Sequence, residues 1–130
     1  MIAVDTNVLA RFITRDDPVQ ANRARRLIEA GPVFVAKTVL LELEWVLRGA
    51  YGMDRPTILK AMRGVLGLPG LTVEDESNVA RAIEWYEAGL DFADAFHLAS
   101  SGRQRAFATF DQSLRKRAGR AVVGFEIVSP

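Results

Sequence analysis

The chain has 130 residues, the length of a single domain with one hydrophobic core and too short for two. Hydrophobic residues make up 49% of it and charged residues 25%, which is typical of a folded globular protein and excludes a disordered or fibrous one. The 17 basic and 16 acidic residues leave a net charge of +1, so no overall attraction to nucleic acid or to an anionic membrane is expected. We therefore expect one domain over residues 1–130, in which any contact with nucleic acid is local.

The absence of cysteine excludes several kinds of site. The chain cannot form a disulfide framework, a thiolate metal site or a cysteine nucleophile, and this fits a reducing compartment. No stretch approaches the roughly 18 uncharged apolar residues of a membrane span. We expect a soluble, cytoplasmic protein without a membrane partner.

Short strands and helices alternate along the predicted chain. Strands are expected at residues 1–4, 33–36, 71–73 and 106–109. Helices are expected at residues 7–14, 18–30, 38–50, 55–66, 76–88 and 91–101, and a last short helix and strand follow residue 111. Because parallel strands need crossover connections, this order predicts an α/β fold. The expected architecture is a three-layer sandwich with a central parallel sheet of four to five short strands flanked by helices.

Two aspartates stand where predicted strands end. Asp5 follows the first strand and Asp111 follows the fourth. Ligands of open parallel sheets bind beyond the carboxyl ends of the strands. If these two strands are neighbours, the two carboxylates converge there. The structural alternatives, which stay open, are a turn cap for Asp5 and a helix N-cap for Asp111.

The predicted helix 38–50 is so apolar that at least one of its two glutamates is expected at or near the core. Glu44 has Arg48 four residues on, which predicts an exposed ion pair. Glu42 has no opposite charge three or four residues away. The spacing therefore favours Glu42 as the acid near the core, and an exposed helix position is its structural alternative.

Asp94 lies in an equally apolar segment, in which Asp91 and His97 are the other polar residues. Its structural alternative is a capping box with Asp91, three residues earlier. We expect His97 to be hydrogen-bonded within the helix packing, and the aromatic residues to lie in the core or at an interface. Each acid alone has an ordinary explanation, but Asp5, Glu42, Asp94 and Asp111 together favour a common site.

Clustered carboxylates require a positive partner, because two of them about 4 Å apart repel by roughly 4 kcal/mol at an effective dielectric of 20. A shell of carboxylates and water suits Mg²⁺ or Mn²⁺ better than Zn²⁺. Such ions usually act on phosphate esters, where they neutralise phosphoryl charge and activate a water.

The order and spacing of these motifs resemble the PIN-domain ribonucleases over essentially the whole chain. The matching segments are Asp-Thr-Asn at residues 5–7, the apolar helix around Glu42, Asp-Phe-Ala-Asp-Ala at residues 91–95 and Thr-Phe-Asp at residues 109–111. The length and the segments 41–48 and 91–95 most resemble the VapC-type toxins of toxin–antitoxin pairs.

The resemblance implies a Mg²⁺- or Mn²⁺-dependent endoribonuclease that leaves 5′-phosphate and 3′-hydroxyl ends. The implied catalytic and metal-binding residues are Asp5, Glu42, Asp94 and Asp111. Three further residues are implied to lie around these ligands: Asn7, Thr109 and Asp91. Of these, Asn7 and Thr109 are implied to form hydrogen bonds with the acids.

The resemblance also implies a homodimer, an RNA substrate and a cognate antitoxin that blocks the acidic pocket. Candidate RNA-binding residues are Arg11, Arg15, Arg103, Arg105, Arg115, Lys116, Arg117 and Arg120. The alternatives are a non-catalytic binding module of the same fold and a phosphotransfer domain. The second is disfavoured, because the phosphatase pattern needs an aspartate at the place of Asn7 and a receiver needs a lysine near Thr109.

Overall fold

The computed structural model describes residues 1–121 and 124–130. The chain divides into two compact units, Met1–Glu76 and Ser77–Pro130. Within the described ranges no helix is long and apolar enough to cross a membrane.

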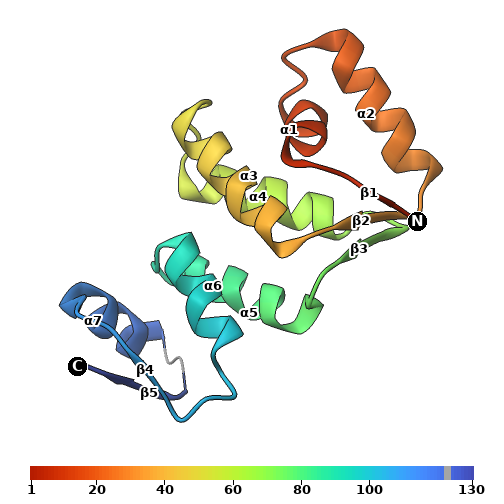
Figure 1. The fold of residues 1–130 in the computed structure, drawn as a ribbon. Coiled ribbons are helices and arrows are strands. Elements are labelled where there is room, and N and C mark those ends of the chain that lie inside the picture. Colours follow the sequence, from red (N-terminus) through yellow and green to blue (C-terminus); the bar gives the residue numbers. More distant parts are fainter. Residues whose placement is uncertain (122–123) are drawn as a thin grey trace. The chain divides into compact units, whose positions relative to one another are not determined.

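The first unit is built on a three-stranded parallel sheet in the order β1-β2-β3, whose strands run side by side in Figure 1. The strands are β1 (Ile2–Ala3), β2 (Val33–Val35) and β3 (Leu71–Val73). Parallel strands need crossover connections, and helices supply them. These are α1 (Thr6–Thr14) and α2 (Pro18–Ala30) after β1, and α3 (Lys37–Gly49) and α4 (Arg55–Leu66) after β2.

Aspartates start three of these four helices. The side chains of Asp5, Asp17 and Asp54 accept hydrogen bonds from backbone N–H groups three residues on, at 3.0, 3.1 and 3.0 Å. Each bond satisfies a backbone donor that has no partner within the helix. These caps fix where α1, α2 and α4 begin.

The second unit contains α6 (Phe92–Ser100), α7 (Gln112–Ala121) and most of α5 (Glu76–Glu87). Two further parallel strands pair there, β4 (Ala106–Ala108) and β5 (Glu126–Val128). The ring of Phe92 lies between those of Tyr86 and Phe96, with centroid distances of 4.9 and 4.8 Å. This aromatic cluster packs the end of α5 against α6.

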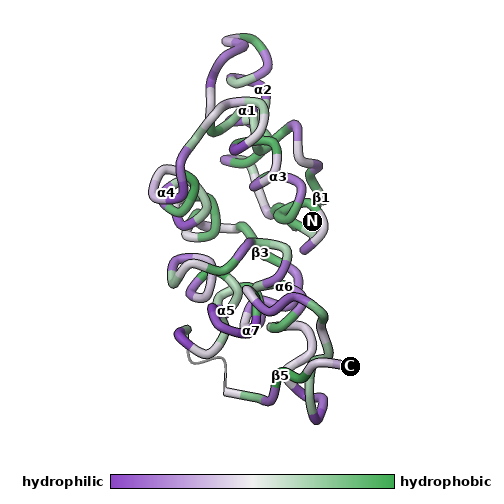
Figure 2. The backbone as a smooth tube through the Cα atoms, turned by 90° about the vertical axis from the view of Figure 1, so that its left-hand side faces the viewer, coloured by the Kyte–Doolittle hydropathy of each residue, from purple (hydrophilic) through white to green (hydrophobic). Residues whose placement is uncertain are grey.

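The predicted α/β fold is confirmed. All the described strands are parallel and short, and they form one sheet of three and one of two. The helices and strands begin and end within one or two residues of the predicted positions. Figure 2 shows hydrophobic and hydrophilic residues alternating along the helices, as expected for helices with one covered face.

Helix α3 carries one of the main apolar faces of the first unit. Leu40, Leu43 and Leu47 lie on one side of it and are fully buried, whereas Trp45 is 65% exposed. Residues spaced by three, four and seven positions share a helix face, so this stripe is expected to supply much of the packing energy of the helix.

We predict that Leu43→Ala lowers the free energy of unfolding by about 2–5 kcal/mol, because it leaves a cavity in a closely packed interior. Trp45→Ala on the same helix is the control, and we expect it to change that free energy by less than about 0.5 kcal/mol. Urea unfolding followed by circular dichroism measures both. Equal losses for the two variants would contradict this assignment of the buried face.

Candidate active site

The four predicted acids are divided between the two units. Asp5 and Glu42 belong to the first unit, and Asp94 and Asp111 belong to the second. Each pair has its own surroundings within its unit. The convergence of all four stays a prediction.

Asp5 is the N-cap of α1, whereas its structural alternative was a turn cap. Its Oδ1 accepts a hydrogen bond from the Val8 N–H at 3.0 Å. No group in the described ranges donates to its Oδ2, and the residue is exposed. The cap therefore orients the carboxylate and leaves one oxygen accessible to a ligand. Asn7 is exposed in the first turn of the same helix.

A groove of about 440 Å³ opens beside Asp5 and runs between α1 and α2. Its walls combine the predicted acid and its neighbour with basic, amide and apolar side chains. The lining residues are Asp5, Asn7, Val8, Arg11, Gln20, Arg23, Ala24 and Leu27. Gln20 and Arg23 are on α2, and the sequence analysis did not select them as site residues.

The prediction that Glu42, and not Glu44, is the glutamate of α3 near the core is wrong. Glu44 is the buried one, at 4% exposure, and Glu42 is exposed. Glu44 lies four residues after Leu40 and three before Leu47, within the buried stripe, so its environment follows from the face it occupies and not from its nearest charges. The predicted ion pair with Arg48 is present at 3.0 Å, but its carboxylate end is buried.

Asp94 lies in the first turn of α6 and is half-buried. Its backbone N–H donates to Oδ2 of Asp91 at 3.2 Å, so Asp91 caps the helix as predicted. The reciprocal half of a capping box is missing, because the Asp94 carboxylate accepts no hydrogen bond from any described residue. The capping-box alternative therefore explains the role of Asp91 as the N-cap of α6, but it gives no role to the Asp94 side chain.

The surroundings of Asp94 disfavour its ionised form. Partial burial, reinforced by the negative charges of Asp91 and Asp111, raises the pKa of this carboxyl. His97 and Arg117 oppose the increase without cancelling it. A carboxylate that is partly desolvated and repelled by two others is a candidate functional group, because a bound cation would relieve both effects.

Asp111 follows β4 and caps α7, since its Oδ1 accepts from the Leu114 N–H at 3.0 Å. The Thr109 hydroxyl accepts from the Asp111 N–H, also at 3.0 Å. Thr109 was predicted to hydrogen-bond an acid, and it contacts the backbone of Asp111 instead of the carboxylate. Its role is thus to fix the turn that presents Asp111.

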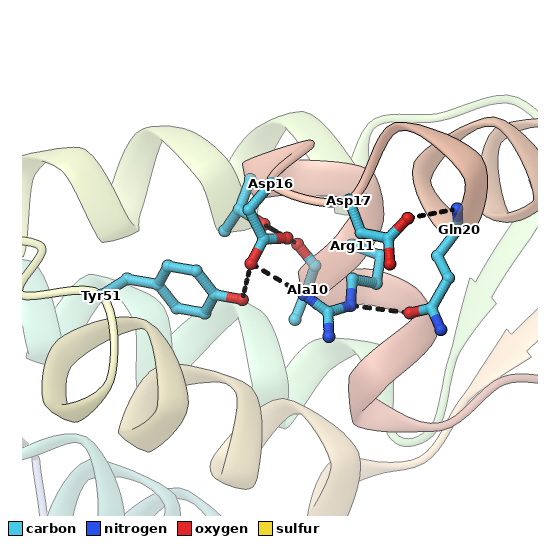
Figure 3. Close-up of polar contacts among 7 residues, drawn as sticks. Ala10, Arg11, Asp16, Asp17, Gln20 and Tyr51 are labelled. Carbon is cyan, nitrogen blue, oxygen red and sulfur yellow. Dashed lines mark hydrogen bonds and ion pairs between the residues drawn. The ribbon is translucent and has the colours of Figure 1, made fainter.

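A polar network that could not be predicted from the sequence includes Arg11, one of the residues that line the groove (Figure 3). The Asp16 carboxylate accepts three hydrogen bonds: from Arg11 Nη1 at 2.7 Å, from the Tyr51 hydroxyl at 2.8 Å and from the Thr14 hydroxyl at 2.9 Å. The Arg11 bond is the largest of the effects that hold the pKa of the Asp16 carboxyl well below its usual range, and the Asp16 bond likewise raises the pKa of Arg11. Tyr51 is 35 residues from Asp16, so no local pattern could have identified this pair.

Other predicted surroundings need correction. Trp85 and Tyr86 are buried, as expected, but Trp45 and Phe110 are 65% and 83% exposed, so these two do not lie in the core and an interface position for them stays a prediction. His97, expected within the helix packing, is exposed on α6. The sequence located the helices that carry Trp45 and His97 but did not determine which of their faces are covered.

The donor chemistry of the acids suits a hard cation. Carboxylate oxygens are preferred ligands of Mg²⁺ and Mn²⁺, and Asp94 offers one with no protein partner in the described ranges. Within those ranges no three acidic or histidine side chains lie close enough together to hold a metal ion. Asp94 therefore fits a single ligand position, and the remaining ligands stay a prediction.

A family model for the PIN domain matches residues 2–120. The chain belongs to the PIN domain family. The match includes parts of both units, and PIN domains are generally nucleases. Comparisons with curated proteins and with solved structures find no match. The matched range includes all four residues that the resemblance implies as metal ligands: Asp5, Glu42, Asp94 and Asp111.

We predict that Asp94→Asn raises the melting temperature of the metal-free PIN domain at neutral pH. Because the folded state raises the pKa of this carboxyl, its ionisation opposes folding above that pKa, and the gain should vanish as the pH falls through it. Thermal unfolding in EDTA over a series of pH values measures the effect.

Glu84→Gln is the matched control, because it removes one exposed negative charge from α5 in the same unit. We expect its melting temperature to follow that of the wild type at each pH. A melting temperature that falls in Asp94→Asn at neutral pH would instead make Asp94 a structural residue.

Proposed function

We propose that this PIN domain is a Mg²⁺- or Mn²⁺-dependent endoribonuclease, and that it is the toxin of a toxin–antitoxin pair. The observation that carries the proposal is the Asp94 carboxylate, which is half-buried, repelled by Asp91 and Asp111, and without a hydrogen-bond donor in the described ranges. A bound cation would relieve both the partial desolvation and the repulsion by the two neighbouring carboxylates, which supports a metal-binding role for this group.

Four residues would hold the ion. Asp5 and Asp94 are the proposed central ligands, with Glu42 beside them and Asp111 as the fourth. Such an ion, when bound, neutralises phosphoryl charge and lowers the pKa of a bound water. Two of the ligands are N-caps, so the helices α1 and α7 would restrict how their carboxylates move.

Glu42 is the proposed proton acceptor of the reaction. It is exposed, and it forms no ion pair within the described ranges, so its carboxylate is available to take a proton from the attacking water. The water oxygen bonds to phosphorus as the bond from phosphorus to the 3′-oxygen breaks, and that oxygen takes a proton from solvent as it leaves. The products are a 5′-phosphate and a 3′-hydroxyl.

The toxin role rests on the resemblance of segments 41–48 and 91–95 to VapC-type toxins. It includes a cytoplasmic location, a homodimer and an antitoxin that covers the acidic site. The balanced charge of the chain supports a substrate contact that is local, because a net charge of +1 does not attract RNA to the whole surface.

We predict that the purified chain, free of antitoxin, cuts cellular RNA at discrete positions when Mn²⁺ or Mg²⁺ is present and does not cut it in EDTA. Mapping of the new ends should find 5′-phosphates. Asp94→Asn and Asp5→Asn should both abolish cleavage, and asparagine at position 5 keeps the N-cap of α1.

The charge control Glu84→Gln should cleave as the wild type does. Cleavage that persists in EDTA, or in Asp94→Asn, would contradict the proposed metal mechanism. Metal-dependent cleavage that ends in 2′,3′-cyclic phosphates would contradict water as the nucleophile.

A further inference from the structure

We infer that the groove between α1 and α2 binds the phosphodiester backbone of an RNA strand beside Asp5, with Arg23 as its main phosphate-binding residue. The inference rests on the proposed function, since it assigns that function's substrate to a surface of the first unit. Its starting point is the set of hydrogen-bond donors that the groove presents.

Arg11 is held in place by its own neighbours. Its Nε donates to Gln20 Oε1 at 2.8 Å and its Nη1 to Asp16 Oδ2 at 2.7 Å, as Figure 3 shows. Nη2 has no partner among the described residues, so its two N–H groups are free to donate. A guanidinium fixed in this way loses little side-chain entropy when it binds an anion.

The same network orients Gln20. Because its carbonyl oxygen accepts from Arg11, its amide nitrogen is left as a donor of two hydrogen bonds. The Asp17 carboxylate accepts from the Gln20 backbone N–H at 3.1 Å and so fixes the start of α2. The groove wall therefore presents donors, which an anionic oxygen can accept.

Arg23 differs from Arg11 in having no compensating acid. It lines the groove one turn after Gln20, it is exposed, and it forms no ion pair or hydrogen bond within the described part of the chain. Asp5 shares the groove but does not pair with it. Arg23 therefore contributes a positive charge on a planar guanidinium, which can donate two parallel hydrogen bonds to the oxygens of one phosphate group.

The position of Asp5 favours RNA over other anions. A single phosphate would occupy the donors, whereas a strand that continues along the groove would also pass the proposed catalytic acid, because Asp5 lines the same groove. An acidic protein segment offers carboxylates to the same donors without presenting a bond for the site to cleave. The shared groove thus links binding and the proposed reaction.

The test measures RNA binding without cleavage. Fluorescence anisotropy with a short labelled single-stranded RNA in EDTA, over a series of salt concentrations, gives the affinity and its salt dependence. We predict that Arg23→Ala weakens binding roughly three- to tenfold and lowers the slope of log affinity against log salt by about 1. Arg23→Lys should recover part of the affinity, because it keeps the charge.

Arg25→Ala is the matched control, since Arg25 is on the same helix, outside the groove lining, and paired with Glu29 at 2.9 Å. It removes the same charge and should leave the affinity near that of the wild type. Equal effects of Arg23→Ala and Arg25→Ala, or no effect of Arg23→Ala, would overturn the inference. Binding of poly-glutamate that depends on Arg23, with RNA binding unaffected by it, would overturn it in favour of an acidic protein partner.

The RNA-binding test of the groove and the RNA-cleavage test of the proposed function can fail independently. If Arg23→Ala weakens RNA binding but the wild type does not cleave RNA with Mn²⁺, the groove is correct and the nuclease proposal fails. If the wild type cleaves and binding is insensitive to Arg23, the nuclease proposal stands and the groove assignment fails.

Discussion

The electrostatic position of Asp94 is the constraint on which this account depends. Its carboxylate is half-buried, two further carboxylates raise its pKa, and no described residue donates a hydrogen bond to it. Folding must tolerate this unfavourable charge, and ionisable groups with shifted pKa values of this kind cluster at functional sites. The chain belongs to the PIN domain family, whose members are generally nucleases, and the metal-binding role proposed for Asp94 would offset this charge.

The proposed ligands are also part of the local structure. Asp5 and Asp111 follow short strands and start α1 and α7, so each uses one oxygen for a backbone N–H and has a second oxygen available for the proposed ion. Thr109 fixes the turn before Asp111 in the same way that a helix cap fixes the start of α1. The interpretation as helix caps and the interpretation as metal ligands are therefore compatible.

The sequence predicted what depends on local periodicity and capping. It located the helices and strands, the N-cap at Asp91 and the i,i+4 pair of Glu44 with Arg48. It failed where a contact joins distant residues, as with Asp16 and Tyr51, or where the buried face of a helix decides an environment, as with Glu42. It also missed Arg23, because a basic residue without a partner is visible only when the groove beside it is known.

The most direct test of the central claim is calorimetric titration of Mn²⁺ into the metal-free chain in the absence of RNA. The account predicts that the wild type and Glu84→Gln bind the ion and that Asp94→Asn does not, because its neutral amide does not offset the charge of a cation. Equal binding by all three proteins would place the metal elsewhere. An absence of binding to the wild type would contradict a metal-binding role for Asp94.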